Sequence, residues 1–216
     1  MKKLRTYLAL LVILLGNLSF SIAVAINFTP LFKWSLTDLS TSELSREVIM
    51  KNYTILLNYL NNPWIQRLNM PNFESSAQGL FHFSEVKKLF MLNYSILAFS
   101  LIFGFFLIRY LKKKNELSAL IKLMSYTMYG PLIVLILLLV NFDRIFILFH
   151  EVFFNNEAWI FNPSIDPIIN VLPQSFFLTC FIFVFILFEV QLILTYLLLK
   201  KNLRRNYEKN QPVINV

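Results

Sequence analysis

Two short stretches concentrate polar and ionisable side chains in an otherwise apolar sequence. The first, residues 79–88, contains His82, and the second, residues 143–166, contains His150; these are the only two histidines of the chain. Polar groups that adjoin membrane-length apolar stretches are costly and need a reason. Histidine titrates near neutral pH, so it can take up a proton and return it. Acid–base chemistry by a histidine pair is the best enzyme hypothesis that these residues offer, beside the simpler and more common alternative of two polar side chains at a membrane interface.

The spacing of the charged neighbours suggests how the histidines would be held. His82 and Glu85 are three residues apart, so on a helix they share a face and the carboxylate can orient the imidazole. Asp143 and His150 are seven residues apart and would share a face two turns from each other. Arg144 can bind an ester or headgroup oxygen. The simpler interpretation of Asp143 and Arg144 is a local ion pair where a helix ends.

Other kinds of catalytic centre find little support in the sequence. No serine lies in a Gly-x-Ser-x-Gly turn, and the single cysteine, Cys180, lies in an apolar run without a basic neighbour. A metal site is possible in principle, but the sequence has neither a His-Glu-x-x-His motif nor a cysteine pair. We therefore expect no metal. The residues that could supply ligands to one are His82, His150, Glu85 and Glu151.

Four apolar stretches must position these residues, because each can cross a bilayer as a helix of about 20 residues. The chain is 57% hydrophobic and 15% charged, unlike a soluble domain. The predicted spans are residues 7–26, 89–108, 123–142 and 176–199. The first also resembles a signal peptide, but its apolar core exceeds the usual length of roughly 7–15 residues, so we favour an uncleaved helix. The expected fold class is an all-α integral membrane protein with four transmembrane helices.

The distribution of basic residues predicts the orientation of these spans. Thirteen of the 20 Lys and Arg residues lie before the first span, between the second and third, and after the fourth. That side carries two acidic residues, whereas the other carries seven basic and nine acidic ones. Because loops rich in Lys and Arg stay in the cytoplasm, we expect both termini there. Residues 27–88 and 143–173 then form a small extracellular cap. The net charge of +8 reflects topology and lipid headgroups, with no nucleic-acid partner expected.

The larger outer segment contains one predicted helix. Its periodicity runs from Thr41 to Leu60, with Ser42 or Thr41 as the N-cap and Glu43 in the first turn. The sequence Asn-Asn-Pro that ends at Pro63 should terminate it. The smaller outer segment is rich in aromatic residues, as an interfacial segment should be. The residues expected on the apolar face of the helix are Leu44, Val48, Tyr53, Leu56, Leu57 and Leu60.

Longer motifs carry a resemblance to a known family. The run from Asp143 to Pro167, followed by Leu172-Pro173 and Phe176-Phe177, resembles the signature of the bacterial lipoprotein intramolecular transacylase (Lit) family. The run from Ser76 to Lys87 resembles the second motif of that family, and the helix around residues 52–60 is similar to its outer domain. The resemblance covers most of the chain and includes the same four-span layout.

The resemblance implies an acyltransferase of the bacterial cell membrane that works at the outer leaflet. Such an enzyme moves the sn-2 acyl chain of a diacylglyceryl-modified lipoprotein to the α-amino group of its N-terminal cysteine, giving a lyso-form N-acyl lipoprotein. Donor and acceptor belong to one molecule, so no soluble cofactor is expected; the expected partners are diacylglyceryl lipoproteins and membrane lipid. An amine with a pKa of about 8 must lose a proton before it attacks, and the ester then develops an oxyanion.

The resemblance also implies roles for particular residues. His82 and His150 become the expected catalytic pair, one as base and one as the group that stabilises the oxyanion, with the two roles unassigned. Glu157 and Asn162 stand where the family pattern has Asp, so a carboxylate is kept at the first position and lost at the second. The residues expected to orient the catalytic pair are Glu85, Asp143, Arg144, Asn156 and Asp166.

Two other functions compete with this one. The first is a non-enzymatic membrane protein, such as a small transporter or a sensor subunit. Transport would be favoured by broken helices in paired repeats, and the sequence offers only Gly104 and Gly130-Pro131 without a repeat. The second is a metal-dependent membrane hydrolase, built on the possible ligands named above.

Overall fold

The computed structural model describes residues 2–36 and 44–210, and of residues 206, 207, 209 and 210 the backbone alone. Among these residues the secondary structure is helical throughout. In chain order the helices are α1 (Lys2–Asn27), α2 (Pro30–Ser35), α3 (Arg46–Asn61), α4 (Ala77–Lys113), α5 (Leu117–Thr127), α6 (Tyr129–Val140), α7 (Phe142–Phe153), the 3₁₀ helix η1 (Pro167–Asn170) and α8 (Gln174–Asn210).

Four stretches of helix are long and apolar enough to cross a membrane, which confirms the predicted all-α membrane fold. They are Lys2–Asn27, Ala77–Lys113, Leu117–Val140 and Gln174–Arg205. The third begins before the predicted residue 123 and is interrupted between α5 and α6. Pro131 explains the interruption, because it lacks the N–H that would bond the carbonyl of Thr127.

The second span differs most from its prediction at its start. We expected a helix from residue 89, but α4 begins at Ala77, so His82 and Glu85 lie on the same continuous helix as the span. Its 37 residues correspond to about 55 Å, against a bilayer core of about 30 Å. The charged run that ends at Lys88 lies at its N-terminal side. The N-terminal turns of α4 therefore carry the charged residues, and its apolar stretch starts near Leu89.

Helix α3 ends at Asn61 as predicted, but the predicted start at Thr41 is wrong. The helix begins at Arg46, because Ser45 is extended and its Oγ accepts a hydrogen bond from the N–H of Val48. Thr41, Ser42 and Glu43 lie outside the described residues. Of the expected apolar face, Tyr53, Leu56 and Leu60 are buried, Val48 and Leu57 are only partly buried, and Ile49 and Tyr59 are buried instead.

The chain forms two compact units. Unit 1 comprises Met1–Ser21, Ser95–Leu135 and Phe185–Val216, and unit 2 comprises Ile22–Tyr94 and Ile136–Val184. Helices α1, α4, α6 and α8 therefore contribute residues to both units.

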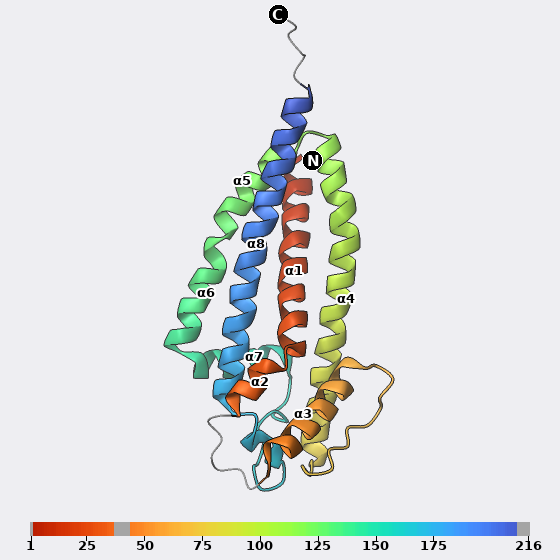
Figure 1. Cartoon of the computed structure of the whole chain (residues 1–216), viewed down its shortest axis with the longest axis vertical. Helices are drawn as coiled ribbons and strands as arrows, with labels where there is room; N and C mark the ends of the chain where they lie inside the picture. Colours follow the sequence, from red (N-terminus) through yellow and green to blue (C-terminus); the bar gives the residue numbers. More distant parts are fainter. Residues whose placement is uncertain (1, 37–43, 211–216) are drawn as a thin grey trace, which may run out of the picture. The chain divides into compact units, whose positions relative to one another are not determined.

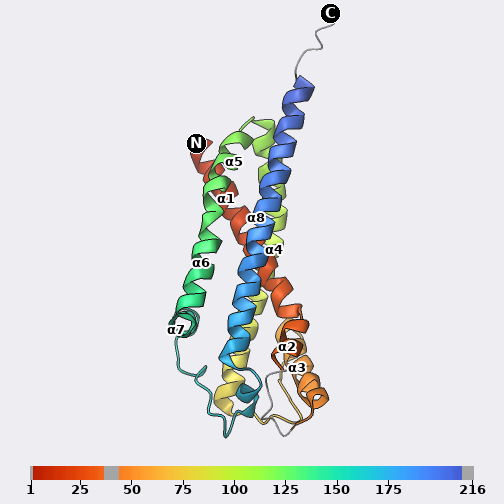
Figure 2. The ribbon, with the colours of Figure 1, turned by 60° about the vertical axis from the view of Figure 1, so that its left-hand side comes forward.

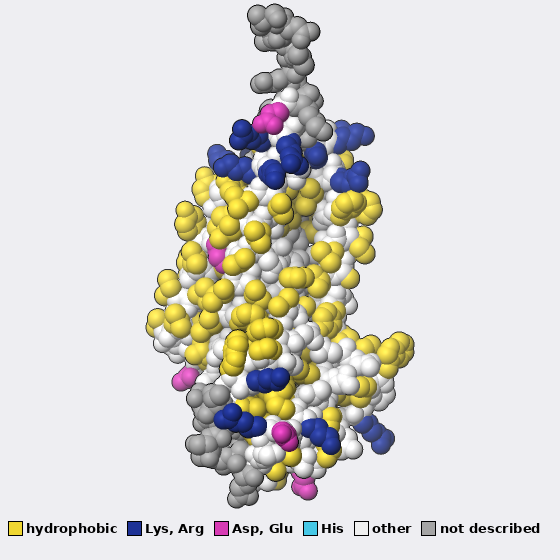
Figure 3. All heavy atoms as spheres, in the orientation of Figure 1, with side chains coloured by type: hydrophobic (Ala, Val, Ile, Leu, Met, Phe, Trp, Pro, Cys, Tyr) yellow, Lys and Arg dark blue, Asp and Glu magenta, His cyan; other side chains and the backbone are white. Residues whose placement is uncertain are grey.

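Unit 1 packs α1 closely against α4. A Cβ on Gly16 would lie 3.0 Å from the Cβ of Ser100, so the small side chains let the helix backbones approach. Near the start of α1, Arg5 donates to Glu116 Oε1 and to the hydroxyl of Tyr110, each over 2.9 Å. Figure 3 shows Lys and Arg side chains gathered at this end of the unit, beside an apolar surface, as the positive-inside rule expects of a membrane protein. The buried cluster around this end contains Ala9, Leu10, Ile13, Leu111, Leu117, Leu120, Ile121, Met124 and Leu199.

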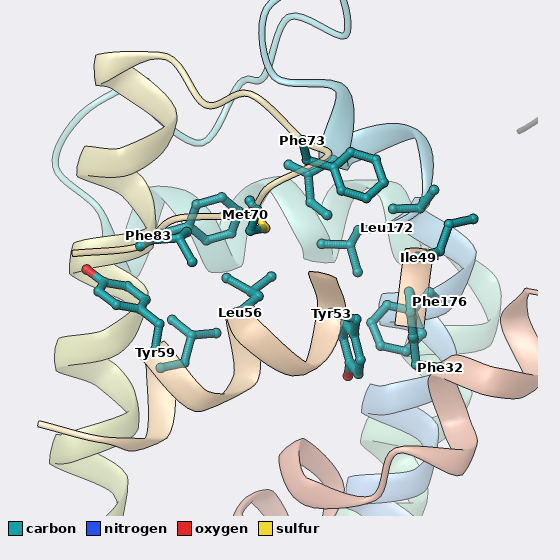
Figure 4. Close-up of a cluster of buried hydrophobic side chains, with 14 of the residues drawn as sticks. Phe32, Ile49, Tyr53, Leu56, Tyr59, Met70, Phe73, Phe83, Leu172 and Phe176 are labelled. Atoms are coloured by element: carbon teal, nitrogen blue, oxygen red, sulfur yellow. The ribbon is translucent and has the colours of Figure 1, made fainter. Parts of the chain in front are cut away.

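Unit 2 is built on one face of α3. Figures 1 and 2 show α2 and α3 side by side, and Figure 4 shows Ile49, Tyr53 and Leu56 of α3 directed into a shared apolar cluster. The ring of Phe32 stacks on Tyr53 at 3.7 Å, and Phe176 meets both rings edge-on. This cluster buries the first turns of α8 with α2 and α3, and it thereby fixes the scaffold around the histidines.

The Arg5–Glu116 pair gives a test of the packing in unit 1. Replacing Arg5 by Ala leaves the carboxylate of Glu116, which is 8% exposed, without its cation. We expect the free energy of unfolding to fall by about 1–3 kcal/mol, measured by thermal or denaturant unfolding in detergent. The matched control is Arg204→Ala, because the Arg204–Glu208 pair is exposed and should contribute less than about 1 kcal/mol. Equal effects of the two substitutions would contradict this packing.

Candidate active site

His82 of α4 and His150 of α7 come together in unit 2. Their ring centroids are 6.0 Å apart, and the rings are inclined by 32°. Both side chains are buried, with 7% and 8% of their surfaces exposed. The two sequence stretches that hold the only histidines therefore meet at one place, in an arrangement where one small reacting group can contact both imidazoles.

The surroundings of His150 determine which of its nitrogens carries the proton. Its Nδ1 lies 2.7 Å from the carbonyl oxygen of Phe146, one turn earlier on α7. A carbonyl can only accept, so Nδ1 is protonated and Nε2 keeps a lone pair in the neutral ring. Trp159 stacks on the imidazole at 4.5 Å and 28°, which holds the ring plane. In this tautomer the lone pair of His150 Nε2 can accept a proton.

His82 is surrounded differently. Phe154 and Phe161 meet its ring edge-on, at 4.8 Å and 5.5 Å between centroids. Its Nδ1 is buried without a hydrogen-bond partner among the described residues. An orphaned N–H is rarer in proteins than an orphaned acceptor, which favours the tautomer with the proton on Nε2. His82 is thereby suited to donate a hydrogen bond from Nε2.

Burial keeps both imidazoles neutral at pH 7. Burial, together with a smaller effect of the neighbouring His150, lowers the pKa of His82 to about 4. Burial also lowers the pKa of His150, although its bond to the carbonyl of Phe146 opposes this change. A neutral imidazole can accept a proton at one nitrogen and donate one from the other, which are the two abilities that acyl transfer requires.

Glu85 supports the site in a way that the sequence did not predict. We expected its carboxylate to orient His82, but Asn156 Nδ2 donates to both of its oxygens, each over 3.1 Å. The side-chain oxygen of Asn156 in turn accepts from the N–H of Ala158. Glu85 therefore ties the segment after α7, which carries Phe154 and Trp159, to α4.

Asp166 fixes the start of α4. Its carboxylate is 2% exposed and accepts from both the N–H and the Oγ of Ser76, over 2.8 Å and 2.7 Å. The Oγ of Ser76 accepts from the N–H of Gly79, as an N-cap does. A negative charge at this end of a helix is also favoured by the helix dipole. Gly79 is required by this close approach, because a Cβ there would overlap the carboxylate of Asp166.

Among the described contacts, none joins Asp143 or Arg144 to either imidazole. Asp143 accepts a hydrogen bond from Gln174 Nε2 over 2.9 Å, which joins the first turns of α7 and α8. Arg144 is exposed. The ion pairs found among the described residues are Arg5–Glu116 and Arg204–Glu208. The expected ion pair between Asp143 and Arg144 is therefore not formed there. The two residues begin α7, whereas we expected them to end a helix.

Several contact residues were missed at the sequence level. Trp159 belongs to the smaller outer segment, whose aromatic residues we expected at the membrane interface, but its ring stacks on His150. Ser76 is an N-cap residue, and reading it as one would have placed the start of α4 correctly. Within the described part of the chain, no group of three or more His, Cys, Asp or Glu side chains is placed to hold a metal ion.

The helices, the histidine pair and the similarity to known proteins together define the family of this chain. The four membrane-length helices define an integral membrane protein, and the buried pair of imidazoles is its candidate site for proton transfer. The model of the lipoprotein intramolecular transacylase Lit family matches residues 7–177, and the chain belongs to this family. The predicted family and enzyme class are thereby confirmed, and the non-enzymatic alternative is set aside. None of the curated proteins that were compared matches the chain.

Solved structures show the same fold. The in meso structure of the membrane-integral lipoprotein intramolecular transacylase Lit from Bacillus cereus is similar with a TM-score of 0.85 and 24% identity, over 97% of this chain and 99% of that one. A variant of that protein with a histidine replaced by arginine gives a TM-score of 0.81 at 24% identity, over 98% and 95%. A variant with alanine there gives 0.81 at 23% identity, over 96% of each chain.

The contact between Gly79 and Asp166 can be tested by adding one methyl group. In a Gly79→Ala variant, the new Cβ must displace the buried carboxylate from Ser76. We expect a loss of about 1–3 kcal/mol in the free energy of unfolding, from the broken hydrogen bonds and the strain. Unfolding in detergent measures this loss. Gly130→Ala is the control, because a Cβ there meets nothing within 4 Å; a loss as large in the control would contradict the argument.

Burial of the histidines also predicts how stability depends on pH. An unfolded imidazole titrates near 6.5, whereas the pKa of folded His82 is about 4. Between these values the unfolded chain binds more protons, so stability is fully present above pH 6.5 and falls as the pH is lowered toward 4. Thermal unfolding across this range should show a shallower decline for His82→Gln than for the unaltered chain. An unchanged slope would show that His82 is not buried in a neutral form.

Proposed function

We propose that the chain transfers the sn-2 acyl chain of a diacylglyceryl lipoprotein to the α-amino group of that lipoprotein's N-terminal cysteine. The observation that carries the proposal is the pair of neutral, buried imidazoles 6.0 Å apart, with different nitrogens available. Membership of the transacylase family gives the type of reaction. The histidine pair supplies a base and a hydrogen-bond donor for it.

In the proposed reaction His150 acts first. Its Nε2 takes a proton from the α-ammonium group, whose pKa of about 8 leaves it mostly protonated at neutral pH. The free amine nitrogen attacks the carbonyl carbon of the sn-2 ester and forms a C–N bond. The ester carbonyl becomes an oxyanion, which His82 stabilises by donating from Nε2.

The second half of the reaction returns the proton. The oxyanion collapses, the bond between the carbonyl carbon and the glycerol oxygen breaks, and the protonated His150 gives its proton to that oxygen. The attacking nitrogen still carries two protons after the C–N bond forms, and it loses one of them to water as the amide forms. The products are an amide at the cysteine, a free hydroxyl at the sn-2 position and one proton released to water, so atoms and charge balance without a co-reactant. Because both reacting groups belong to one molecule, much of the rate can come from holding them in contact.

The remaining polar residues are proposed as positioning groups. Glu85 and Asn156 would hold the segment that carries Trp159 over His150, and Asp166 would hold the start of α4 and so the height of His82. Asp143 would hold the start of α7 through Gln174. Arg144, exposed in the first turn of α7, is free to meet an ester or headgroup oxygen of the substrate.

The location of the reaction follows from the same proposal. The Lys and Arg residues at the end of unit 1 where α1 begins would lie in the cytoplasm, together with both termini. The histidines would then lie at the outer leaflet of the cell membrane, at the depth of the lipid ester. Support comes from the charge distribution along the sequence and from the apolar helices.

The two histidine roles predict different results for glutamine substitutions. His150→Gln removes the base, and we expect lyso-form product to fall by about 10²- to 10⁴-fold. His82→Ala removes an N–H donor, and the product should fall by roughly 10²- to 10³-fold. His82→Gln keeps an N–H donor, so its loss of product should be smaller. Mass spectrometry of a lipoprotein N-terminus, in a host that makes only diacyl lipoproteins, measures the product.

The control for these variants is Val152→Ala, which changes an exposed side chain on the same helix and should leave the product unchanged. Full lyso-form production by His150→Gln or His82→Ala would overturn the proposal. The metal-dependent alternative makes the opposite prediction for a chelator, which should abolish activity if a metal acts and have no effect on histidine catalysis.

A further inference from the structure

The turn after α3, residues 62–66, presents a tryptophan to its surroundings. Trp64 is 85% exposed, although the indole ring is large and mostly apolar. The turn beneath it is ordered by hydrogen bonds: Asn62 Oδ1 accepts from the N–H of Trp64, and the carbonyl of Asn62 accepts from the N–H of Ile65. The indole is therefore held outward by a defined turn, and it makes little contact with the rest of unit 2.

A closed ring of hydrogen bonds fixes the level of this turn relative to the membrane-spanning helices. Asn27, the last residue of α1, donates to the hydroxyl of Tyr94 over 2.8 Å. Tyr94 donates to Asn61 Oδ1 over 2.6 Å, and Asn61 Nδ2 donates to Asn27 Oδ1 over 3.2 Å. Because Tyr94 lies within the apolar stretch of α4, the end of α3 is held beside the outer edge of that stretch.

A second contact fixes the same level independently. Lys87 Nζ donates to the carbonyl of Ile65, and its ammonium lies 4.3 Å from the ring centroid of Tyr59. Lys87 belongs to the last charged residues of α4 before the apolar stretch begins near Leu89. The turn therefore lies where α4 changes from charged to apolar side chains, which is the level of a bilayer interface.

This level is where tryptophan is most favourable in a membrane protein, because its ring is apolar and its N–H can bond to headgroup oxygens. A second tryptophan, Trp34 of α2, is 61% exposed. Its ring meets Phe28 edge-on, and Phe28 is the residue that follows the end of α1. We propose that the turn after α3 is a lipid anchor, in which Trp64 inserts among the glycerol and headgroup oxygens of the bilayer and holds the end of α3 there.

The three tryptophans of the chain allow a direct test by fluorescence. In a Trp34→Phe, Trp159→Phe variant, Trp64 is the single reporter. The protein is reconstituted into phosphatidylcholine vesicles that carry bromine at a shallow or a deep acyl carbon. We expect blue-shifted emission, stronger quenching by shallow than by deep bromine, and weak quenching by aqueous iodide.

A matched reporter defines the behaviour of a water-exposed tryptophan on α3, the helix that precedes the turn. Lys51→Trp, combined with Phe at all three native positions, places the reporter on the exposed face of α3. Trp64 should be quenched by shallow bromolipid at least about twofold more than this reporter, as interfacial insertion requires. Iodide quenching of Trp64 equal to that of the Lys51→Trp reporter, without bromolipid quenching, would overturn the proposal. Circular dichroism confirms that both variants are folded, and neither measurement depends on acyl transfer.

Discussion

The site depends on the cost of placing a charged imidazole in apolar surroundings. Burial lowers the pKa of both histidines, so each is neutral under the conditions where an amine must be deprotonated. The aromatic rings that cause this burial also set the geometry: Trp159 holds the plane of His150, and Phe154 lies against His82. The same packing therefore decides the protonation state and the orientation of the pair.

The polar contacts around the pair serve this packing. Asn156 donates from Nδ2 to Glu85, and its Oδ1 accepts from the N–H of Ala158 in the same loop. The irregular segment after α7 therefore has a fixed position on α4. Asp166 binds the opposite part of that segment to the start of α4, where Gly79 leaves room for the carboxylate. Neither carboxylate contacts an imidazole through a described hydrogen bond. In the proposed reaction, their effect on the chemistry would pass through the position of the rings.

Much of this arrangement could be predicted from the sequence, for identifiable reasons. The four spans follow from apolar length, and the two histidines stood out because ionisable residues are rare beside such spans. The start of α4 could not be read in the same way, because residues 77–88 are neither uniformly apolar nor strictly periodic. The stacking of Trp159 on His150 depends on an irregular loop, whose path is set by side-chain bonds such as that of Asn156 to Glu85. No local pattern in the sequence encodes such a path.

The continuity of α4 has a mechanical consequence. His82 lies seven residues before Leu89 on one unbroken helix, which corresponds to a rigid extension of about 10 Å beyond the start of the apolar stretch. A helix whose apolar length does not match the surrounding hydrocarbon responds by tilting or by deforming the lipid. With the proposed orientation in the membrane, the height of the imidazole above the acyl chains would therefore be coupled to bilayer thickness. If His82 acts as proposed, membranes with longer or shorter lipids would present the ester to it at a different depth.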